Sequence, residues 1–264
     1  MELQLADRVA IVTGGGMGIG RAVARELLLE GMSVAICSRT IRTLETTAGE
    51  LMAEVSGRVE PIVVDTTDMS AVEAMVSETM QRFGRVDLLV NGAAAPGGMV
   101  RSDLREASDQ GLLQDLDTKV VGYFRCAKAV AVPMREAKFG RIVNIGGLTG
   151  RSSRRLSGMR NVAICHLTKN LSDQLGPDGI TVNLVHPGVT ETEHSHDLYA
   201  NEAKKQGLTA REIENSYIEA TPIGRIIQPE EVGQLIAFLA SPLAGAITGE
   251  SIAIDGGMSR GIYL

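Results

Sequence analysis

Residues 13–20 read TGGGMGIG and lie between the apolar run RVAIVT (8–13) and the helical segment GRAVARELLLEG (20–31). A glycine-rich turn in this strand–turn–helix context is typical of dinucleotide-binding folds. The glycines let the turn close and let the backbone approach a pyrophosphate, which then lies on the N-terminus of the following helix. A glycine-rich turn without a ligand is the alternative interpretation.

Outward from this turn, short β-branched runs alternate with longer amphipathic segments. Near-continuous apolar strands separated by helices predict a parallel sheet that is covered on both faces. With right-handed crossovers, we expect a single doubly wound, Rossmann-type α/β domain over residues 1–264, with a seven-stranded sheet. Polar residues of segment 187–228 predict short helices that form a lid over the site. The predicted strands are 8–13, 33–37, 60–65, 86–91, 141–145, 180–186 and 251–255.

Composition narrows the classes of partner. The chain has 264 residues, of which 44% are hydrophobic and 22% charged, and a formal net charge of −6. This balance argues against a general nucleic-acid binder. Three scattered cysteines without a CxxC pair fit reduced thiols. Neither a signal peptide nor an apolar stretch of about 18 residues is visible. We therefore expect a cytoplasmic protein with a small-molecule substrate and no nucleic-acid or membrane partner.

The whole chain resembles the short-chain dehydrogenase/reductase family. Residues 13–20 match its TGxxxGIG fingerprint, and Asp65 in VDTTD matches the Asp that contacts adenine. NGAA from Asn91, the PGxxxT segment 187–192 and ITGESIAIDGG (247–257) match further family segments. The resemblance implies a nicotinamide cofactor. The expected cofactor-binding residues are Thr13, Gly14, Gly16, Met17, Gly18, Ile19, Gly20, Ser38, Arg39, Asp65, Thr66, Asn91, Gly92, Ala93, Asn161, Pro187, Gly188, Thr190 and Thr192.

The end of the second strand decides which nicotinamide cofactor is expected. An acidic residue there would bind the ribose 2′-hydroxyl and repel a 2′-phosphate. This chain has Ser38-Arg39, with no carboxylate before Glu45, and a hydroxyl beside a guanidinium suits a phosphate. Met17 stands where relatives that prefer the phosphate often carry a second basic residue, and Arg39 could be an ordinary surface arginine. NADP(H) is favoured over NAD(H).

The catalytic pattern of the family is missing. The resemblance implies a Tyr that acts as general acid or base, a Lys four residues later, a Ser upstream and an Asn on an earlier helix. Matching flanks place these four positions at Ser157, Asn161, Gly147 and Lys119, respectively. No Tyr occurs between residues 124 and 198 and no Lys between 139 and 168, so a shifted alignment does not restore the motif. A serine hydroxyl, with a pKa far above the roughly 10 of tyrosine, cannot replace the phenol as proton donor.

The Asn and Lys positions have exchanged their residue types. If the two helices face one site, Lys119 and Asn161 would still supply an ammonium and an amide. Lys119 could then stabilise a developing oxyanion, or act as an acid if burial lowers its pKa. The alternative is a coincidence, with Lys119 on a solvated helix face. The candidate catalytic residues are Lys119, Ser157, Asn161 and His186.

Histidines offer weaker candidates. His186 ends the sixth predicted strand and could titrate near pH 7, although a structural histidine is the more ordinary interpretation. His194 and His196, with Glu193 and Asp197, contain metal-binding groups. Their spacing fixes no ligand geometry, so no metal is expected.

Other side chains near the altered motif stay open. An arginine cluster is either a solvated face or a site for a carboxylate or phosphate of the substrate; its members are Arg151, Arg154, Arg155 and Arg160. Ser152, Ser153 and Ser157 lack a neighbouring His–Asp pair that would mark a nucleophile. Tyr199 and Tyr217, in the expected lid, could bring a phenol from elsewhere.

Three functions remain compatible with these residues. The first is an NADP(H)-dependent oxidoreductase with a non-standard active site and a small, possibly anionic, substrate. The second is a non-redox isomerase, lyase or hydrolase on the same scaffold, and the third is a catalytically silent nucleotide-binding protein. The resemblance also implies a homotetramer or homodimer, built around the apolar helix predicted at about 111–137.

Overall fold

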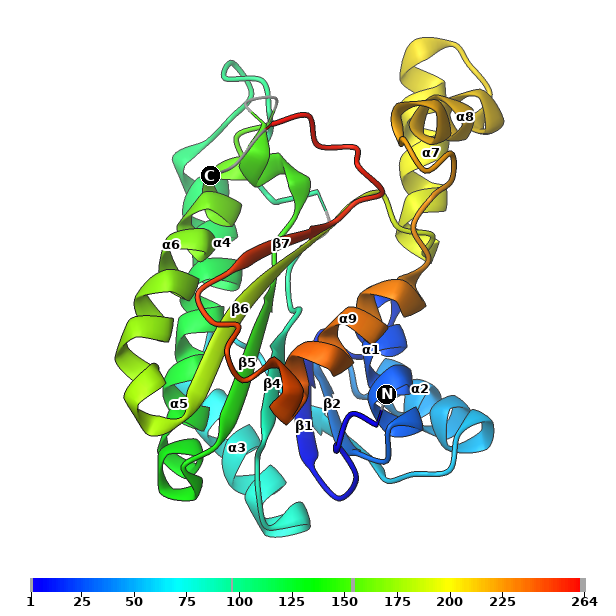
Figure 1. The fold of residues 1–264 in the computed structure, drawn as a ribbon. Coiled ribbons are helices and arrows are strands. Elements are labelled where there is room, and N and C mark those ends of the chain that lie inside the picture. Colours follow the sequence, from blue (N-terminus) through cyan, green and yellow to red (C-terminus); the bar gives the residue numbers. More distant parts are fainter. Residues whose placement is uncertain (1, 96, 153–154, 262–264) are drawn as a thin grey trace.

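The computed structural model describes residues 2–95, 97–152 and 155–261. Seven parallel strands form one sheet in the order β3-β2-β1-β4-β5-β6-β7 (Figure 1). All seven predicted runs form strands, with ends within two residues of those expected, so the predicted doubly wound sheet is confirmed. The strands are β1 (Val9–Thr13), β2 (Ser33–Ser38), β3 (Val59–Val63), β4 (Leu88–Asn91), β5 (Gly140–Ile145), β6 (Ile180–Pro187) and β7 (Ser251–Ile254).

Helices cover both faces of the sheet. Helices α1, α2 and α9 lie on one side, and α3, α5 and α6 lie on the other (Figure 1). The helices are α1 (Gly18–Leu29), α2 (Ile41–Glu54), α3 (Met69–Phe83), α4 (Asp109–Leu116), α5 (Gly122–Ala137), α6 (Gly158–Leu175), α7 (Glu193–Gln206), α8 (Ala210–Ala220) and α9 (Pro229–Ala240).

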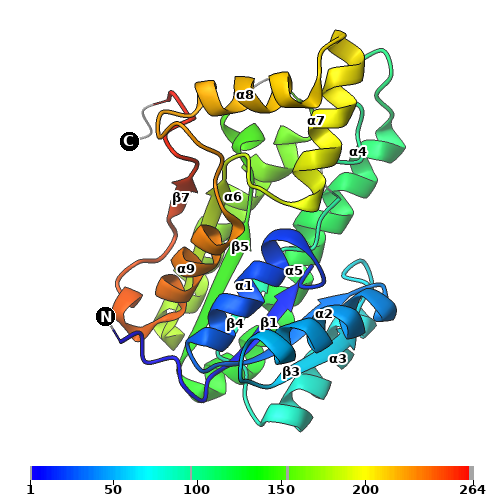
Figure 2. The same cartoon turned by 90° about the vertical axis from the view of Figure 1, so that its right-hand side faces the viewer.

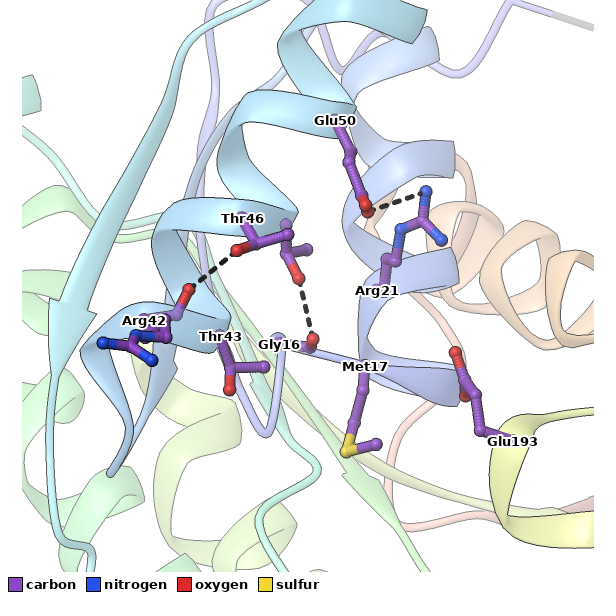
Figure 3. Close-up of a pocket in the computed structure, with 9 residues that line it drawn as sticks. Gly16, Met17, Arg21, Arg42, Thr43, Thr46, Glu50 and Glu193 are labelled. Atoms are coloured by element: carbon purple, nitrogen blue, oxygen red, sulfur yellow. Dashed lines mark hydrogen bonds and ion pairs between the residues drawn. The ribbon is translucent and has the colours of Figure 1, made fainter.

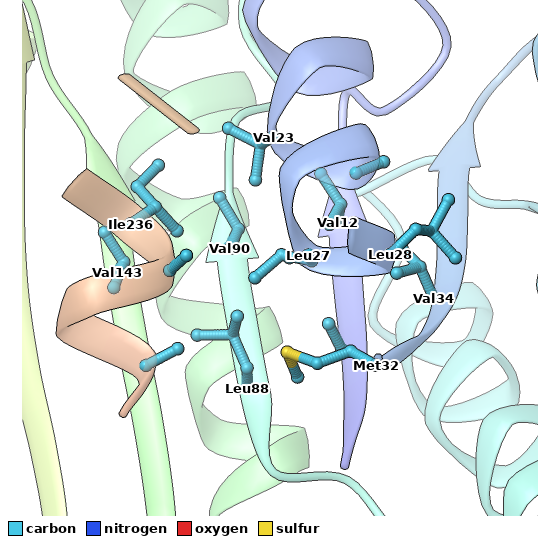
Figure 4. Close-up of a cluster of buried hydrophobic side chains, with 14 of the residues drawn as sticks. Val12, Val23, Leu27, Leu28, Met32, Val34, Leu88, Val90, Val143 and Ile236 are labelled. Atoms are coloured by element: carbon cyan, nitrogen blue, oxygen red, sulfur yellow. The ribbon is translucent and has the colours of Figure 1, made fainter. Parts of the chain in front are cut away.

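The core explains why the strands read as continuous apolar runs. Successive residues of a strand point to opposite faces, and both faces are buried: Val12 packs in the cluster under α1 and α9, whereas Ile11 packs in the cluster under α3 and α5. Figure 4 shows the first cluster, in which Leu27 and Ile236 are fully buried. Burial of each such side chain contributes about 1.5–3 kcal/mol.

The helix predicted at about 111–137 is interrupted. Helix α4 leads into a π-helix, Asp117–Val121, which continues directly into α5. A π-helix holds i→i+5 hydrogen bonds, is rare, and is frequent at functional sites. Lys119 lies in its centre and is 3% exposed. The solvated position that was the alternative for Lys119 is therefore wrong.

Segment 187–228 contains α7 and α8, as the sequence predicted. The two helices lie beyond the edge of the sheet formed by the carboxyl ends of the strands (Figure 2). They pack on each other through Tyr199, Ala203 and Ile213, and a bridge between Thr190 and Ile227 ties the two ends of the segment together. Within the described part of the chain, no helix has the length and apolar character needed to cross a bilayer.

Candidate active site

The glycine-rich turn has the geometry that close approach to a ligand requires. Gly14 has a φ of 73°, and a Cβ there would lie 2.8 Å from the carbonyl oxygen of Gly92. The Thr13 hydroxyl accepts hydrogen bonds from the backbone N–H groups of Gly92 (3.1 Å) and Ala93 (3.3 Å), which joins the turn to the segment after β4. No side chain caps the start of α1 at Gly18, so its first N–H groups can bind an anion.

A cavity of about 420 Å³ lies beside this turn (Figure 3). It opens between α1 and the start of α2, next to the end of β2 that carries Ser38 and the exposed Arg39. Arg39 was predicted from the sequence as a cofactor residue, but Arg42 was not. A second arginine three residues after Arg39 could have indicated it. The residues lining the cavity are Gly16, Met17, Arg21, Arg42, Thr43, Thr46, Thr47, Glu50 and Glu193.

The residues at this end fit a phosphate-bearing nucleotide. Arg39 and Arg42 are both exposed, and among the described residues no ion pair occupies either guanidinium. The Ser38 hydroxyl, which accepts a hydrogen bond from the backbone N–H of Thr40 at 3.3 Å, lies beside them. Guanidinium and hydroxyl donors suit phosphate oxygens.

Two other predicted cofactor residues are held by their own neighbours. The Asp65 carboxylate accepts hydrogen bonds from the backbone N–H and the hydroxyl of Thr67, at 3.0 and 2.8 Å, and these bonds lower its pKa, with a smaller effect from Arg39. Asn91 is fully buried, and its amide donates to Asn144 Oδ1 at 2.9 Å. The Asn91 side chain therefore stabilises the sheet at the strand end that borders the site.

The segment after β6 closes the other side of the site. The Thr190 hydroxyl donates to the Gly188 carbonyl at 3.1 Å. Thr192 precedes α7 and exchanges hydrogen bonds with Ser195 in a capping box. Close packing allows no side chain at Gly188, where a Cβ would lie 2.8 Å from Asp255 Cα. These contacts hold 188–192 next to the glycine-rich turn, where a Cβ at Gly18 would lie 3.6 Å from Thr192 Cγ2.

Lys119 and Asn161 meet at the carboxyl end of β5. Lys119 Nζ donates to Asn161 Oδ1 at 2.9 Å and to the Gly146 carbonyl at 3.0 Å. Asn161 Nδ2 in turn donates to Thr149 Oγ1 at 2.7 Å. The two exchanged residue types thus lie in direct contact across two helices, as the sequence suggested.

Burial changes the acid–base chemistry of the Lys119 amine. Desolvation, helped by the positive charge of Arg160 and opposed by the negative charge of Asp115, lowers its pKa to about 7. An amine with this pKa can give or take a proton near neutral pH, where an ordinary lysine stays protonated. Arg160 was predicted only as a member of the arginine cluster, and Asp115 was not predicted at all.

Position 157, where the sequence predicts the equivalent of the family's tyrosine, is covered by another part of the chain. Ser157 is 2% exposed and packs against Gly98, where a Cβ would lie only 2.5 Å from Ser157 Cβ. The backbone around Gly98 is anchored on both sides: Arg160 Nη2 donates to the Ala95 carbonyl at 3.0 Å, and the backbone N–H of Met99 donates to Asp115 at 3.0 Å. A side chain larger than serine at 157 would displace this segment.

His186 holds the backbone at Gly147, where the sequence predicts the equivalent of the family's serine. The ring is fully buried, its Nδ1 lies 3.0 Å from both the N and the O of Gly147, and its Nε2 lies 2.9 Å from Ser251 Oγ. Burial, with smaller contributions from Arg151 and Lys119, lowers its pKa to about 4. His186 is therefore the structural histidine of the more ordinary interpretation and not a group that titrates near pH 7.

The arginine cluster is dispersed among protein partners. Arg160 is buried and pairs with Asp115 at 2.6 Å, Arg155 lies 3.5 Å from Glu202 of α7, and Arg151 donates to the Ser251 carbonyl at 2.8 Å. Arg154 and Ser153 lie outside the described residues. A shared anion site formed by these arginines is not assembled among the described members.

The remaining candidates lie apart from the Lys119–Asn161 contact or in the expected lid. His196 pairs with Glu191 at 2.6 Å, and across the described ranges no group of three His, Cys, Asp or Glu side chains could hold a metal ion. The rings of Tyr199 and Tyr217 contact each other at a tilt of 36°, with centroids 5.8 Å apart. Burial is the main cause that raises the pKa of each phenol to about 12, which makes both poor acids near neutral pH.

Comparison with known proteins supports the family expectation. A family model described as Enoyl-(Acyl carrier protein) reductase matches residues 14–259. The chain is a short-chain dehydrogenase/reductase. It is 35% identical over 257 residues to the short-chain reductase protein NovJ of Streptomyces niveus, covering 95% of this chain and 94% of that one. It is 30% identical over 262 residues to the NADPH-dependent reductase BacG of Bacillus subtilis, covering 98% of this chain and all of that one.

Solved structures of short-chain dehydrogenase/reductases agree with this fold. The actinorhodin polyketide ketoreductase with NADPH superposes with a TM-score of 0.90 at 33% identity, covering 99% of this chain and 100% of that one. Similarity therefore extends along the whole chain and includes both the cofactor end and the Lys119 end.

Proposed function

We propose that this short-chain dehydrogenase/reductase is an NADPH-dependent reductase of a small carbonyl compound, with Lys119 as its proton donor in a non-standard active site. Similarity to NADPH-dependent reductases, and the phosphate-compatible Ser38, Arg39 and Arg42, support the cofactor. The contact of Lys119 with Asn161 supports the site. A bound NADPH would supply the hydride.

The proposed role of Lys119 follows from its setting. Hydride addition to a carbonyl carbon leaves negative charge on the oxygen, which needs a proton or a positive partner. The Lys119 ammonium can supply either, because a pKa of about 7 makes it acidic enough to release its proton near neutral pH. Asn161 and the Gly146 carbonyl hold the amine in one orientation. Ser157 and Gly147, in the places of the family's Tyr and Ser, have no proton-transfer role in this scheme.

The test is consumption of NADPH with a panel of a β-ketoacyl thioester, a ketose and simple ketones, followed by the absorbance of the reduced nicotinamide. Removal of a general acid lowers turnover by about 10²–10⁴-fold, so Lys119→Met should abolish most activity. The matched control is Lys128→Met, which removes an exposed lysine of α5 and should leave turnover unchanged. Equal activity of wild type and Lys119→Met would remove Lys119 from the mechanism.

Fluorescence titration with NADPH separates the other functions. Binding without turnover on the panel would favour the silent nucleotide-binding protein, and the absence of binding would favour a non-redox enzyme. Lys119→Met should bind NADPH with unchanged affinity, because the Lys119 amine of the wild type donates to Asn161 and to the Gly146 carbonyl and not to a group of the glycine-rich turn.

We also propose a cytoplasmic homo-oligomer with 187–228 as a lid. Large apolar side chains remain exposed on α4, α5 and α6, and burying them in a subunit interface would remove them from water. They include Leu113 (64% exposed), Phe124 (44%), Val132 (60%), Met159 (51%) and Val162 (54%). Light scattering on the purified chain tests the assembly, and Phe124→Glu with Val162→Glu should dissociate it.

A further inference from the structure

A buried ion pair lies beside the Lys119–Asn161 contact and joins α6 to α4, the helix that leads into the π-helix of Lys119. Asp115 on α4 and Arg160 on α6 lie 2.6 Å apart, with side chains only 1% and 8% exposed. Asp115 precedes Lys119 by four residues, and Arg160 is next to Asn161 in the chain. Two polar contacts, one ionic and one between an amine and an amide, thus cross between the helices side by side.

The ion pair also holds the segment that covers Ser157. Asp115 Oδ1 accepts the backbone N–H of Met99, and Arg160 donates to the carbonyl of Ala95. Its remaining groups are not satisfied: Asp115 Oδ2 and Arg160 Nε are buried, with no hydrogen-bond partner among the described residues. Incompletely satisfied buried ions are costly, and a well-packed apolar pair is often at least as stable. Stability alone is a weak reason for this pair.

We propose that Asp115 and Arg160 are positioning residues of the reductase site: their buried ion pair holds α4 against α6, fixes the Lys119–Asn161 contact and places two opposite charges beside the amine. The proposal rests on the proposed function, in which Lys119 is the proton donor. Neither residue needs to touch the substrate.

The groups around Lys119 leave few other sources of control. Burial and Arg160 lower its pKa, and Asp115 raises it. The other titratable groups near the amine are Tyr123, whose ring centroid lies 5.9 Å from Nζ, and His186. Burial raises the pKa of Tyr123 and lowers that of His186 to about 4, so both stay neutral near pH 7. The Asp115 and Arg160 charges are then the main electrostatic influence that substitution can change.

The test measures the protonation of Lys119 without substrate or nucleotide. Its ¹³Cε NMR signal, assigned by its loss in Lys119→Met, is followed against pH. Asp115→Asn should lower the titration midpoint and Arg160→Gln should raise it, each by about one pH unit. The control is Asp117→Asn, which removes a carboxylate only two residues from Lys119 that pairs outward with Arg125 at 2.9 Å and should leave the midpoint nearly unchanged.

The direction of the shifts decides the outcome. If the pair were only a structural brace, either substitution would loosen the helices, admit water and raise the midpoint. Opposite shifts therefore support the proposal, whereas shifts in the same direction, or none, overturn it. If Asp115→Asn does not fold, Arg160→Lys replaces it in the test. This variant keeps the positive charge, so its titration midpoint should stay near that of the wild type. A rise as large as in Arg160→Gln would also overturn the proposal. Because no turnover is measured, failure of the proposed reductase activity would be seen separately.

Discussion

Replacement of Gly98 by alanine tests whether Ser157 is as tightly covered as its packing indicates. Gly98 has a φ of 92°, and its new Cβ would lie 2.5 Å from Ser157 Cβ and 3.1 Å from Asp115 Oδ2. Gly97→Ala is a matched control, because Gly97 has a φ of 74° and nothing within 4 Å of a new Cβ. Both variants bear the backbone cost, but only Gly98→Ala bears the collision.

The expected magnitudes follow from these two contributions. A left-handed conformation costs an L-residue about 1–2 kcal/mol, which is the effect expected in Gly97→Ala. Carbon atoms pack at about 3.5–4.0 Å, so the Gly98→Ala methyl group must push Ser157 away by roughly 1 Å, and overpacking of this kind adds about 1–3 kcal/mol. At about 2–4 °C per kcal/mol, Gly98→Ala should melt roughly 5 °C below Gly97→Ala.

The assay is thermal unfolding followed by circular dichroism, with both variants in the wild-type and the Ser157→Gly backgrounds. Ser157→Gly removes the Cβ that Gly98→Ala meets, so it should recover part of the loss in that variant and none in Gly97→Ala. Equal melting temperatures for Gly98→Ala and Gly97→Ala would show that Gly98 does not pack tightly against Ser157.

Three further outcomes are expected. Between about pH 7 and 10.5, the unfolding free energy of the wild type should rise relative to that of Lys119→Met by up to about 1.4 kcal/mol per pH unit. The reason is that the Lys119 amine keeps its proton in the unfolded chain but has lost it in the folded protein. Denaturant titrations at several pH values measure this difference. Introducing the groups that the resemblance implies, with Ser157→Tyr, Asn161→Lys and Gly147→Ser together, should lower the melting temperature and yield no new carbonyl reduction, since Gly98 packs against position 157; a gain in NADPH consumption would contradict this. Arg39→Glu should weaken NADPH binding about tenfold or more, because the new carboxylate repels the 2′-phosphate, and should leave NADH binding unchanged. Fluorescence titrations measure both affinities. Equal losses for the two nucleotides would count against a phosphate site at Arg39.

The fold was predictable because its signals are local. Each strand is a short apolar run that is buried on both faces, as Ile11 and Val12 show, and the glycine-rich turn at Gly14 requires a left-handed backbone. The Lys119–Asn161 contact was predicted only on the condition that the two helices face one site, and the structure meets that condition.

The surroundings of Lys119 were not predictable, because they depend on contacts between distant segments. No sequence pattern around residue 119 predicts a π-helix. No pattern near Gly98 predicts that this glycine packs against Ser157. Arg160 looked like a member of a surface cluster, but its partner Asp115 is 45 residues away. Arg42 was not predicted, because the residues that select the cofactor were expected at the end of the second strand, and Arg42 lies beyond it.

The packing at Gly98 and Gly147 has a consequence for engineering. A Cβ at Gly98 would lie 3.1 Å from Asp115 Oδ2, and a Cβ at Gly147 would lie 3.1 Å from Asn161 Nδ2. A larger side chain at either position would therefore disturb a residue beside Lys119. Variants with altered substrates should for this reason be sought among residues outside these contacts.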